Sequence, residues 1–332
     1  MAVKVAINGL GRIGRCVARI IADRDDVELV AANASGEESM IQYNLKYDSV
    51  HGMRKDVKIE DGYIYIGKDK AKLLSERDPA KLDFAAYGAE VVLECTGAFL
   101  TKESVQGYID NGIKKVVFSA PAKDDTDTFV MGVNEHTYAG QSIVSNASCT
   151  TNGLAPVAKV LDDAFGIEKG LMTTIHSYTG SQPILDAKHK KEPRKARSGA
   201  VNLVPTTTGA AKAIGKVMPH LNGKLNGQAI RVPTPNVSMV DLTVTLNKEV
   251  TLEEVCKAFT TAENGALKGI LATDTEGRVS SDFNGETNST VVPLDTIQVI
   301  GGNMVKVLSW YDNEWGYSCR LVDMGVHVAT SK

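Results

Sequence analysis

The first half of the chain alternates short apolar runs with amphipathic stretches. Residues 3–7 form an apolar run that ends at Asn8, an amphipathic stretch follows over 12–22, and a second strand is expected over 27–32. A strand, a helix and a second strand at this spacing make a parallel, right-handed βαβ unit. Further strand-like runs each follow a helical or turn-rich stretch: 91–95, 115–119 and 142–145. The pattern predicts a Rossmann-type, doubly wound parallel sheet.

The pattern changes after Cys149. A helix is expected over 150–165, and longer strand-like runs follow at 171–177, 228–232, 237–246 and 304–311. Helix-like segments lie between them, at 207–218 and 253–263. A mostly antiparallel sheet covered by helices is the expected second domain. A last helix is expected over 313–328, because its apolar positions recur at helical spacing and Asn313 can cap its start.

Length and composition set the limits of this picture. A chain of 332 residues exceeds the size at which one core keeps growing, so we expect two domains. Their expected bounds are 1–148, completed by the C-terminal helix 313–332, and 149–312. The formal net charge of −3 gives no sign of nucleic-acid or anionic-membrane binding.

The cysteines and the apolar runs indicate a compartment. Five cysteines, an odd number without a CxxC pair, argue against a disulfide framework or a zinc site and favour a reducing environment. The N-terminus runs directly into a strand pattern, unlike a signal peptide. No run of about 18 apolar residues predicts a membrane span. We therefore expect a cytoplasmic protein without a metal.

A glycine-rich turn follows the first strand. The run Gly9-Leu10-Gly11-Arg12-Ile13-Gly14 matches GxGxxG between a strand and a helix, which is the context that a dinucleotide site requires. Gly9 permits the tight turn, Gly11 lets a pyrophosphate approach, and Gly14 lets the helix pack on the strand. The amides of Arg12 and Ile13 and the helix dipole favour phosphates. The alternative is a structural glycine-rich turn.

The end of the second expected strand lacks a carboxylate. NAD-binding proteins usually place an acid there for the ribose 2′-hydroxyl, but this strand ends in Asn33, Ala34 and Ser35. A 2′-phosphate would then meet no directly opposing charge. The alternative is that Glu37, which follows a turn, folds back and binds the 2′-hydroxyl in place of that acid.

A cysteine and a histidine form the candidate reaction centre. Cys149 lies at a strand-to-helix junction, where a helix N-terminus lowers a thiol pKa and favours the nucleophilic thiolate. His176 ends the strand after that helix and is the candidate base. The alternatives are a small buried cysteine and a structural histidine, although polar neighbours argue against an apolar site for Cys149.

Seven segments between Val3 and about Val328 resemble phosphorylating glyceraldehyde-3-phosphate dehydrogenases. They are INGLGRIGR (7–15), LKYDSVHG (45–52), SERDP (75–79), SNASCTTN (145–152), HSYTGSQ (176–182), PTTTGAAKAIGKV (205–217) and WYDNEWGYS (310–318).

The resemblance implies a mechanism and a set of site residues. Cys149 would attack the aldehyde of glyceraldehyde 3-phosphate, and His176 would accept the hydroxyl proton as hydride leaves to the nicotinamide. Inorganic phosphate would then attack the thioester. Thr179 and Arg231 match the site for the substrate's own phosphate. The matches to the site for the attacking phosphate are Ser148, Thr150, Thr208 and Gly209.

The resemblance also implies cofactor contacts and an assembly. Asn313 would hold the nicotinamide amide, and Tyr317 would pack beside the ring. Three residues match the positions along the middle of the cofactor: Thr96, Gly97 and Ser119. The family forms homotetramers, in which the loop around 180–203 crosses to a neighbour's cofactor site.

Two departures from the family fall around the adenosine ribose. NAD-specific members carry Asn-Asp where this chain has Asn33-Ala34, and Leu-Pro where it has Ala187-Lys188. The changes remove a negative charge, open space and add a cation, and Arg77 adds a second cation. We therefore expect NADP to be used at least as well as NAD. The alternative is that Lys188 belongs to a solvated basic run, with Lys190, Lys191, Arg194, Lys195 and Arg197.

Three other functions compete with this interpretation. An erythrose-4-phosphate dehydrogenase would share the fold and the Cys–His pair without needing the attacking-phosphate site. A semialdehyde or acyl-phosphate reductase is disfavoured by the combination of PTTTG with HSYTG. A non-catalytic binding protein is disfavoured because Cys149, His176, Thr179 and Arg231 are all present.

Overall fold

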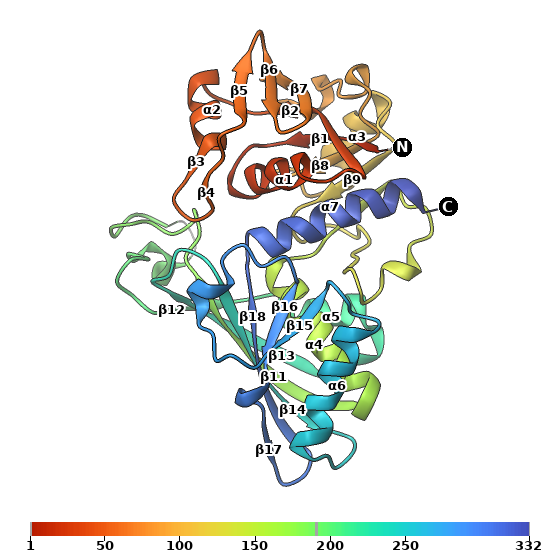
Figure 1. The fold of residues 1–332 in the computed structure, drawn as a ribbon, viewed down its shortest axis with the longest axis vertical. Coiled ribbons are helices and arrows are strands. Elements are labelled where there is room, and N and C mark those ends of the chain that lie inside the picture. The colour runs from red at the N-terminus through yellow and green to blue at the C-terminus, as the bar shows by residue number, and fades with distance from the viewer. Residues whose placement is uncertain (1, 190–191, 332) are drawn as a thin grey trace. The chain divides into compact units, whose positions relative to one another are not determined.

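The computed structural model describes residues 2–189 and 192–331 (Figure 1). The chain divides into two compact units. The first runs to Ser148 and is joined by the segment from Ser318 onward, and the second is Cys149–Tyr317. Two lysines of the basic run noted in the sequence, Lys190 and Lys191, lie outside the described residues.

The first unit contains an eight-stranded sheet in the order β10-β9-β8-β1-β2-β7-β6-β5. The strands from β10 to β7 are parallel, which confirms the Rossmann-type fold. Their bounds are Val3–Asn8 (β1), Val27–Asn33 (β2), Asp69–Leu74 (β7), Val91–Glu94 (β8), Lys115–Phe118 (β9) and Ile143–Ser145 (β10). The sequence pattern did not predict the antiparallel edge strands, Val57–Glu60 (β5) and Tyr63–Ile66 (β6).

Helices cover both faces of this sheet. The side chains of β8 alternate between faces. Val92 lies in a buried cluster with Val105 and Tyr108 of α3. On the other face, Gly325 of α7 approaches Leu93 so closely that a Cβ at Gly325 would lie 3.0 Å from Leu93 Cδ2. The helix bounds are Arg12–Ala22 (α1), Glu38–Lys46 (α2), Lys102–Asp110 (α3) and Trp315–Thr330 (α7). A small ribbon is formed by Tyr47–Asp48 (β3) and Gly52–Met53 (β4).

The second unit contains a mixed sheet in the order β12-β13-β11-β14-β18-β16-β15, with β17 on β18. The pairs β11–β13 and β15–β16 are parallel and the other pairs are antiparallel, which confirms the mostly antiparallel sheet. The strands are Ile167–Ser177 (β11), Val204–Thr207 (β12), Leu225–Val232 (β13), Ser238–Leu246 (β14), Leu271–Asp274 (β15), Thr290–Pro293 (β16), Gln298–Ile300 (β17) and Met304–Tyr311 (β18).

Three helices cover one face of the second sheet. They are Cys149–Phe165 (α4), Ala210–Val217 (α5) and Leu252–Asn264 (α6), and α4 packs against β11, β14, β16 and β18. The strands alternate buried with partly exposed positions, as a sheet covered on one side requires. On the other face Leu171 is 68% exposed and Met304 is 45% exposed.

The start of α7 differs from the sequence prediction. The side chain of Asp312 accepts hydrogen bonds from the amides of Glu314 and Trp315, so Asp312 caps the helix. Asn313 does not, because its side-chain oxygen accepts from the hydroxyl of Ser238. In the described part of the chain, no helix combines the length and apolar character of a membrane span.

Candidate active site

The thiol of Cys149 and the imidazole of His176 face each other in the second unit. The distance from Cys149 Sγ to His176 Nε2 is 3.5 Å. Cys149 is the first residue of α4, and His176 is the penultimate residue of β11. A nucleophile at a helix N-terminus beside an imidazole is the arrangement that covalent thiol catalysis requires. The structure thus brings together the two residues that the sequence singled out.

A left-handed turn precedes the cysteine. Ala147 has φ +58°, a conformation that costs an L-residue roughly 1–2 kcal/mol. The residue is 1% exposed, and its amide donates to the hydroxyl of Ser145. The turn lies between the end of β10 and Cys149, the first residue of α4. Sequence reasoning missed this strain, because the segment contains no glycine to mark it.

Burial and a nearby cation set the titration of the pair. Burial raises the pKa of the Cys149 thiol, whereas the charge of Arg231 and hydrogen bonds involving Thr150 lower it. Burial thus opposes the lowering that was expected from the helix N-terminus. Burial and the charge of Arg231 lower the pKa of His176 to about 3. Burial thus favours the neutral forms of both the thiol and the imidazole.

A backbone carbonyl and a guanidinium both approach the imidazole at Nδ1. His176 Nδ1 lies 2.7 Å from the carbonyl oxygen of Ser177. If Nδ1 carries the proton and donates to that oxygen, Nε2 faces the thiol as an acceptor. Arg231 Nη1 donates to the same carbonyl at 3.0 Å and lies 2.9 Å from Nδ1. The carbonyl thus favours a proton on Nδ1, which leaves Nε2 as the acceptor toward the thiol, whereas the guanidinium, which can only donate, favours an unprotonated Nδ1.

The predicted phosphate-binding residues lie at strand and helix ends. In the parallel pair β11–β13, His176 is in register with Arg231, and Thr179 follows the end of β11. Gly209 precedes α5 as its N-cap, and the hydroxyl of Thr208 accepts from the amide of Ala210. The hydroxyl of Thr179 lies 3.0 Å from that of Ser181. Ser148, the last residue before Cys149, is partly exposed.

Tyr311 is a residue of this site that the sequence analysis did not single out. Its hydroxyl lies 2.9 Å from the hydroxyl of Thr150 and 2.7 Å from that of Thr174. Its ring meets the imidazole of His176 edge-on, with centroids 6.0 Å apart. The Thr150 hydroxyl, which was expected at a phosphate, is thus held by Tyr311. The motif WYDNEWGYS contains Tyr311, but only the structure shows these contacts.

A chain of hydrogen bonds orients the amide of Asn313. The amide of Ser177 donates to the hydroxyl of Ser238, which donates to Asn313 Oδ1 at 2.7 Å. The oxygen is therefore occupied, and the NH₂ group is the end that can serve a ligand. Tyr317, the other predicted nicotinamide contact, is 4% exposed in α7.

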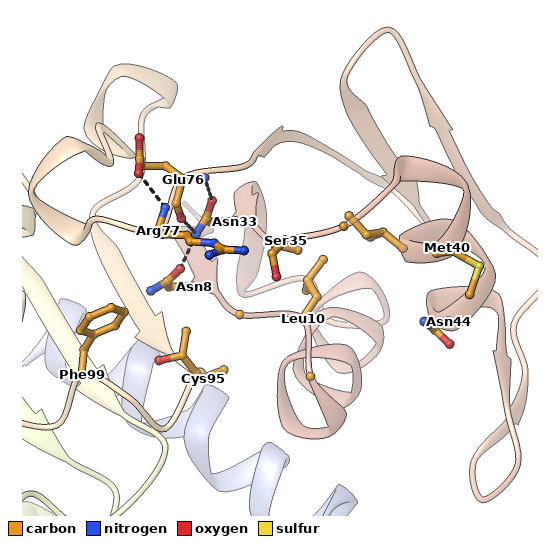
Figure 2. A pocket seen from close by; sticks show the side chains of 16 residues that line it. Asn8, Leu10, Asn33, Ser35, Met40, Asn44, Glu76, Arg77, Cys95 and Phe99 are labelled. Atoms are coloured by element: carbon orange, nitrogen blue, oxygen red, sulfur yellow. Dashed lines mark hydrogen bonds between the residues drawn. The ribbon is translucent and has the colours of Figure 1, made fainter. Parts of the chain in front are cut away.

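A cavity of about 550 Å³ in the first unit is lined by the glycine-rich turn and by the ends of β1, β2 and β8 (Figure 2). Gly9 has φ +96°, and a Cβ at Gly14 would lie 1.9 Å from the Gly9 carbonyl oxygen. A Cβ at Gly11 would meet nothing within 4 Å, so this residue leaves room for a ligand. A turn that opens at the start of α1 fits a pyrophosphate.

One end of this cavity carries the residues expected at the adenosine ribose. Ala34, Ser35 and Arg77 all line it. Figure 2 shows the exposed Arg77 side chain extending toward Ser35. The carboxylate of Glu76 accepts hydrogen bonds from the amides of Arg77 and Asp78, and thus stabilises the loop that contains it. Glu37, the alternative group to bind the 2′-hydroxyl, is not among the described residues that line the cavity.

Asn33 does not have the role that the sequence suggested. Its side chain was expected to present a donor to the 2′-phosphate. In the structure its Nδ2 donates to Asn8 Oδ1 at 2.7 Å and to the Glu76 carbonyl at 2.8 Å, and its Oδ1 accepts the Glu76 amide. Both donor hydrogens are used. Asn33 therefore holds the loop that carries Arg77 and offers the ligand no donor.

The remaining predicted cofactor residues are divided between the units. Thr96 lines the cavity in the first unit, and Gly97 follows it with φ +69°. The amide of Ser119 donates to the carbonyl of Glu94. The side chain of Arg12 pairs with Asp48, and Ile13 lies beside it in the first turn of α1. Lys188 is exposed in a loop of the second unit, so the structure does not place it at the cavity.

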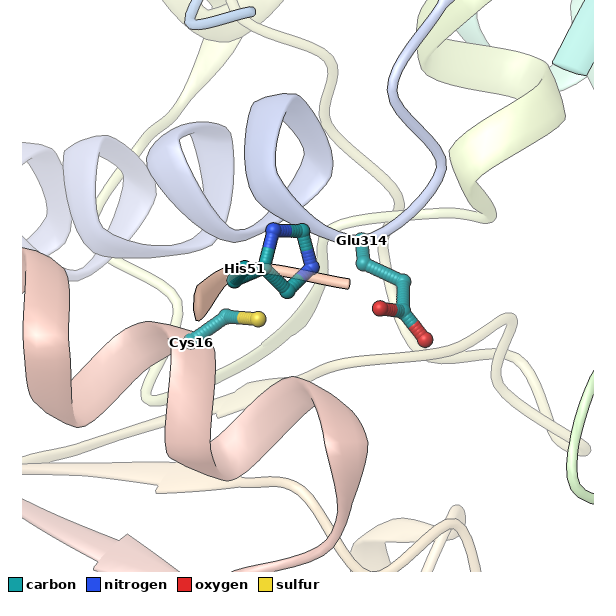
Figure 3. Close-up of side chains that lie close together, drawn as sticks. All are labelled: Cys16, His51 and Glu314. Atoms are coloured by element: carbon teal, nitrogen blue, oxygen red, sulfur yellow. The ribbon is translucent and has the colours of Figure 1, made fainter. Parts of the chain in front are cut away.

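A second thiol and imidazole lie close together in the first unit. Cys16 of α1 and His51 have Sγ and a ring nitrogen within 4.8 Å, and both are drawn in Figure 3. Cys16 is 2% exposed and lies in the second turn of its helix rather than at its N-terminus. Cys16 therefore lacks the solvent access of Cys149 and the electrostatic field of a helix N-terminus. This makes the pair a matched control for Cys149 and His176.

Comparison with known proteins identifies the family. A family described as "Glyceraldehyde 3-phosphate dehydrogenase, NAD binding domain" matches residues 3–102, and its C-terminal domain matches 148–313. The chain is 51% identical to glyceraldehyde-3-phosphate dehydrogenase of Priestia megaterium, over 99% of both chains. It is 51% identical to glyceraldehyde-3-phosphate dehydrogenase 1 of Bacillus subtilis, again over 99% of both.

The similarity extends to a second bacterial group. The chain is 49% identical to glyceraldehyde-3-phosphate dehydrogenase A of Escherichia coli K12, over 99% of this chain and 100% of the relative. These names give no support to the erythrose-4-phosphate alternative. This chain belongs to the glyceraldehyde-3-phosphate dehydrogenase family, the NAD-dependent oxidoreductases that act on this aldehyde.

Proposed function

We propose that this protein oxidises glyceraldehyde 3-phosphate, with inorganic phosphate, to 1,3-bisphosphoglycerate. The observation that carries the proposal is the 3.5 Å approach of Cys149 Sγ to His176 Nε2 at the start of α4. The pair stands in a chain about half identical to enzymes named for this substrate. The chain's residues supply a nucleophile and a base, and a nicotinamide coenzyme, when bound, would supply the hydride acceptor.

Proton transfers at His176 Nε2 connect the steps. Nε2 takes the thiol proton as Cys149 Sγ bonds to the aldehyde carbon, and it returns the proton to the new oxyanion. It takes the hydroxyl proton when the hydride leaves, so the thiohemiacetal becomes a thioester. Phosphate oxygen then attacks the thioester carbon, and the C–S bond breaks. The imidazolium proton returns to the departing sulfur, and the product is an acyl phosphate.

Two anion sites serve the two phosphates in this proposal. Thr179 and Arg231 bind the phosphate of the substrate, supported by their places at the carboxyl ends of β11 and β13. The attacking phosphate is bound by residues at two helix N-termini: Ser148, Thr150, Thr208 and Gly209. Helix N-termini and hydroxyl groups suit tetrahedral oxyanions.

The proposed coenzyme is NADP at least as readily as NAD. Ala34 presents no carboxylate to a 2′-phosphate, and Arg77 lines the same end of the cavity. Lys188 adds a second cation from a neighbouring subunit. At the nicotinamide, Asn313 donates from its NH₂ group and Tyr317 packs beside the ring. The oriented amide of Asn313 supports this assignment.

We propose that the protein forms a homotetramer in which residues 180–203 reach a neighbour's cofactor site. This loop carries apolar side chains that are at least 69% exposed: Ile184, Leu185, Val201 and Leu203. The uncovered sheet face with Leu171 and Met304 is a second surface that suits a partner. Light scattering should give a mass about four times 35.5 kDa. A stable monomer at assay concentrations would contradict both the tetramer and the action of Lys188 in trans.

An assay of phosphate dependence tests the reaction. Coenzyme reduction, followed as absorbance at 340 nm with glyceraldehyde 3-phosphate, should turn over only when inorganic phosphate is present. Erythrose 4-phosphate serves as the control substrate and should have a lower kcat/KM. Turnover that needs no phosphate, or a preference for erythrose 4-phosphate, would contradict the proposal.

A further inference from the structure

A carboxylate lies beneath the coenzyme cavity without a role in the chemistry above. Glu94, the last residue of β8, is 0% exposed. Its Oε1 accepts from the amide and the hydroxyl of Thr96, and its Oε2 accepts from Asn8 Nδ2 at 2.7 Å and from the Tyr108 hydroxyl at 3.0 Å. Each carboxylate oxygen thus faces one N–H donor and one hydroxyl, and these hydrogen bonds oppose the rise in the Glu94 pKa that burial causes.

An ionised carboxylate can only accept hydrogen bonds, and this fixes the orientation of two buried amides. Asn8 must turn its NH₂ group toward Glu94, so its Oδ1 faces Asn33. Asn33 must then turn its own NH₂ group toward Asn8, so its Oδ1 faces the amide of Glu76. We call Asn8 and Asn33 the amide relay. Its members are 1% and 6% exposed, so water does not compete freely for these bonds.

The relay ends at the loop that carries Arg77. Asn33 binds the amide and the carbonyl of Glu76, which fixes the backbone next to Arg77. Figure 2 shows this part of the relay beneath the cavity. The other oxygen of Glu94 holds Thr96, which also lines the cavity. One buried charge therefore connects the ends of β1, β2 and β8 where they form the cavity wall.

We propose that Glu94 is a positioning residue for the coenzyme, which acts through the amide relay to hold Arg77 at the ribose end of the cavity. The inference rests on the proposed coenzyme site and adds a determinant of specificity to it. Arg77 is the group that would meet a 2′-phosphate, so loss of the relay should affect NADP more than NAD. The reaction centre of the second unit contains none of these residues, so kcat at saturating coenzyme should stay unchanged.

A reversal of polarity tests the relay. Glu94→Gln replaces the carboxylate oxygen that accepts from Asn8 with an NH₂ group. This group then faces the NH₂ group of Asn8, or the Asn8 amide turns over and its NH₂ group faces that of Asn33. Adding Asn8→Asp restores the pattern, because the new carboxylate accepts from residue 94 with one oxygen and from Asn33 with the other. The double variant has the shape and net charge of the wild type.

The readout is the dissociation constant of each coenzyme, measured by titration calorimetry with the full-length protein. Glu94→Gln should raise the Kd for NADP about tenfold, the scale of one charge-assisted hydrogen bond, and that for NAD less. The double variant should recover the wild-type ratio of the two constants. Tyr108→Phe is the matched control, because it removes a hydroxyl that contacts both the carboxylate and Asn8 Nδ2 but leaves the donor and acceptor ends of both relay amides unchanged. It should lower Tm without changing that ratio.

The outcomes separate this inference from the proposed function. If Glu94→Gln folds and keeps the wild-type ratio of the two constants, the relay has no role in specificity. If Glu94→Gln does not fold, the double variant decides, and a folded double variant with an altered ratio would overturn the inference. A wild type that binds neither coenzyme would overturn the coenzyme site itself.

Discussion

The reaction centre and the ribose end of the coenzyme cavity are built in opposite ways. In the second unit His176 and Tyr311 are buried, and each is held by neighbours on the same sheet. In the first unit Ser35 and Arg77 are exposed, and Arg77 makes no ion pair within the described part of the chain. In the proposed function, buried groups would therefore carry the chemistry, while a few exposed side chains would decide between the two coenzymes.

The strongest way to break this comparison is to remove the nucleophile. Cys149→Ser should abolish turnover and leave the fold and coenzyme binding intact, because a hydroxyl is a far weaker nucleophile than a thiolate at neutral pH. Cys16→Ser is the matched control and should keep wild-type kcat, since Cys16 is buried away from a helix end. In mass spectrometry, iodoacetamide should label Cys149 first. Labelling of Cys256 first, with activity lost in step, would contradict the assignment.

Removal of the base should have the next largest effect. His176→Asn should lower kcat by roughly 10²–10⁴-fold, the usual contribution of general acid–base catalysis. It should also slow the alkylation of Cys149, because no imidazole then assists loss of the thiol proton. His51→Asn, which changes the other imidazole near a cysteine, should leave both rates unchanged. Near-normal kcat and alkylation in His176→Asn would exclude the histidine as the base.

The coenzyme end should respond more weakly. Ala34→Asp with Lys188→Pro should cut kcat/KM for NADP by about 10- to 100-fold, the equivalent of a lost charge-assisted hydrogen bond, and spare NAD. The new carboxylate repels the 2′-phosphate, and the lost cation no longer attracts it. The wild type should use NADP at least as well as NAD in the same assay. A tenfold or greater preference of the wild type for NAD would show that another group reads the 2′-hydroxyl.

The smallest effect concerns the pH dependence of the thiol. The charge of Arg231 lowers the pKa of Cys149, in opposition to burial. Arg231→Gln should therefore raise the thiol pKa and shift the alkylation rate profile to higher pH, since less thiolate exists at each pH. Alkylation of the variant across a pH series measures this shift. A profile that stays in place or moves to lower pH would show that Arg231 does not stabilise the thiolate.

The sequence predicted the features that depend on neighbours along the chain. The glycine-rich turn, α1 and the cysteine at the start of α4 each depend on a short local pattern. Among the features that it did not predict, the contacts of Asn8 and Thr150 depend on hydrogen bonds between distant residues. Asn8 and Glu94 are separated by 86 positions, and Thr150 and Tyr311 by 161. Periodicity carries no information about such pairs.

Asn33 and Asn313 illustrate how such contacts change an interpretation. Local patterns suggested that the first would offer a donor to the ligand and that the second would cap a helix. Each amide instead binds a group remote in sequence, the backbone of Glu76 for Asn33 and the hydroxyl of Ser238 for Asn313. Asp312, whose side chain has the same length as that of asparagine, accepts hydrogen bonds from the amides of Glu314 and Trp315 at the start of α7.

The way in which the first unit is assembled has a consequence for synthesis. Its sheet is complete by Ser145, yet α7, which contacts Leu93 of that sheet, is the last helix of the chain. In chain order the second unit is an insertion within the first. A ribosome therefore makes the whole second unit before the first can bury that face. During translation the second unit can fold as a continuous segment, while the first waits for its final helix.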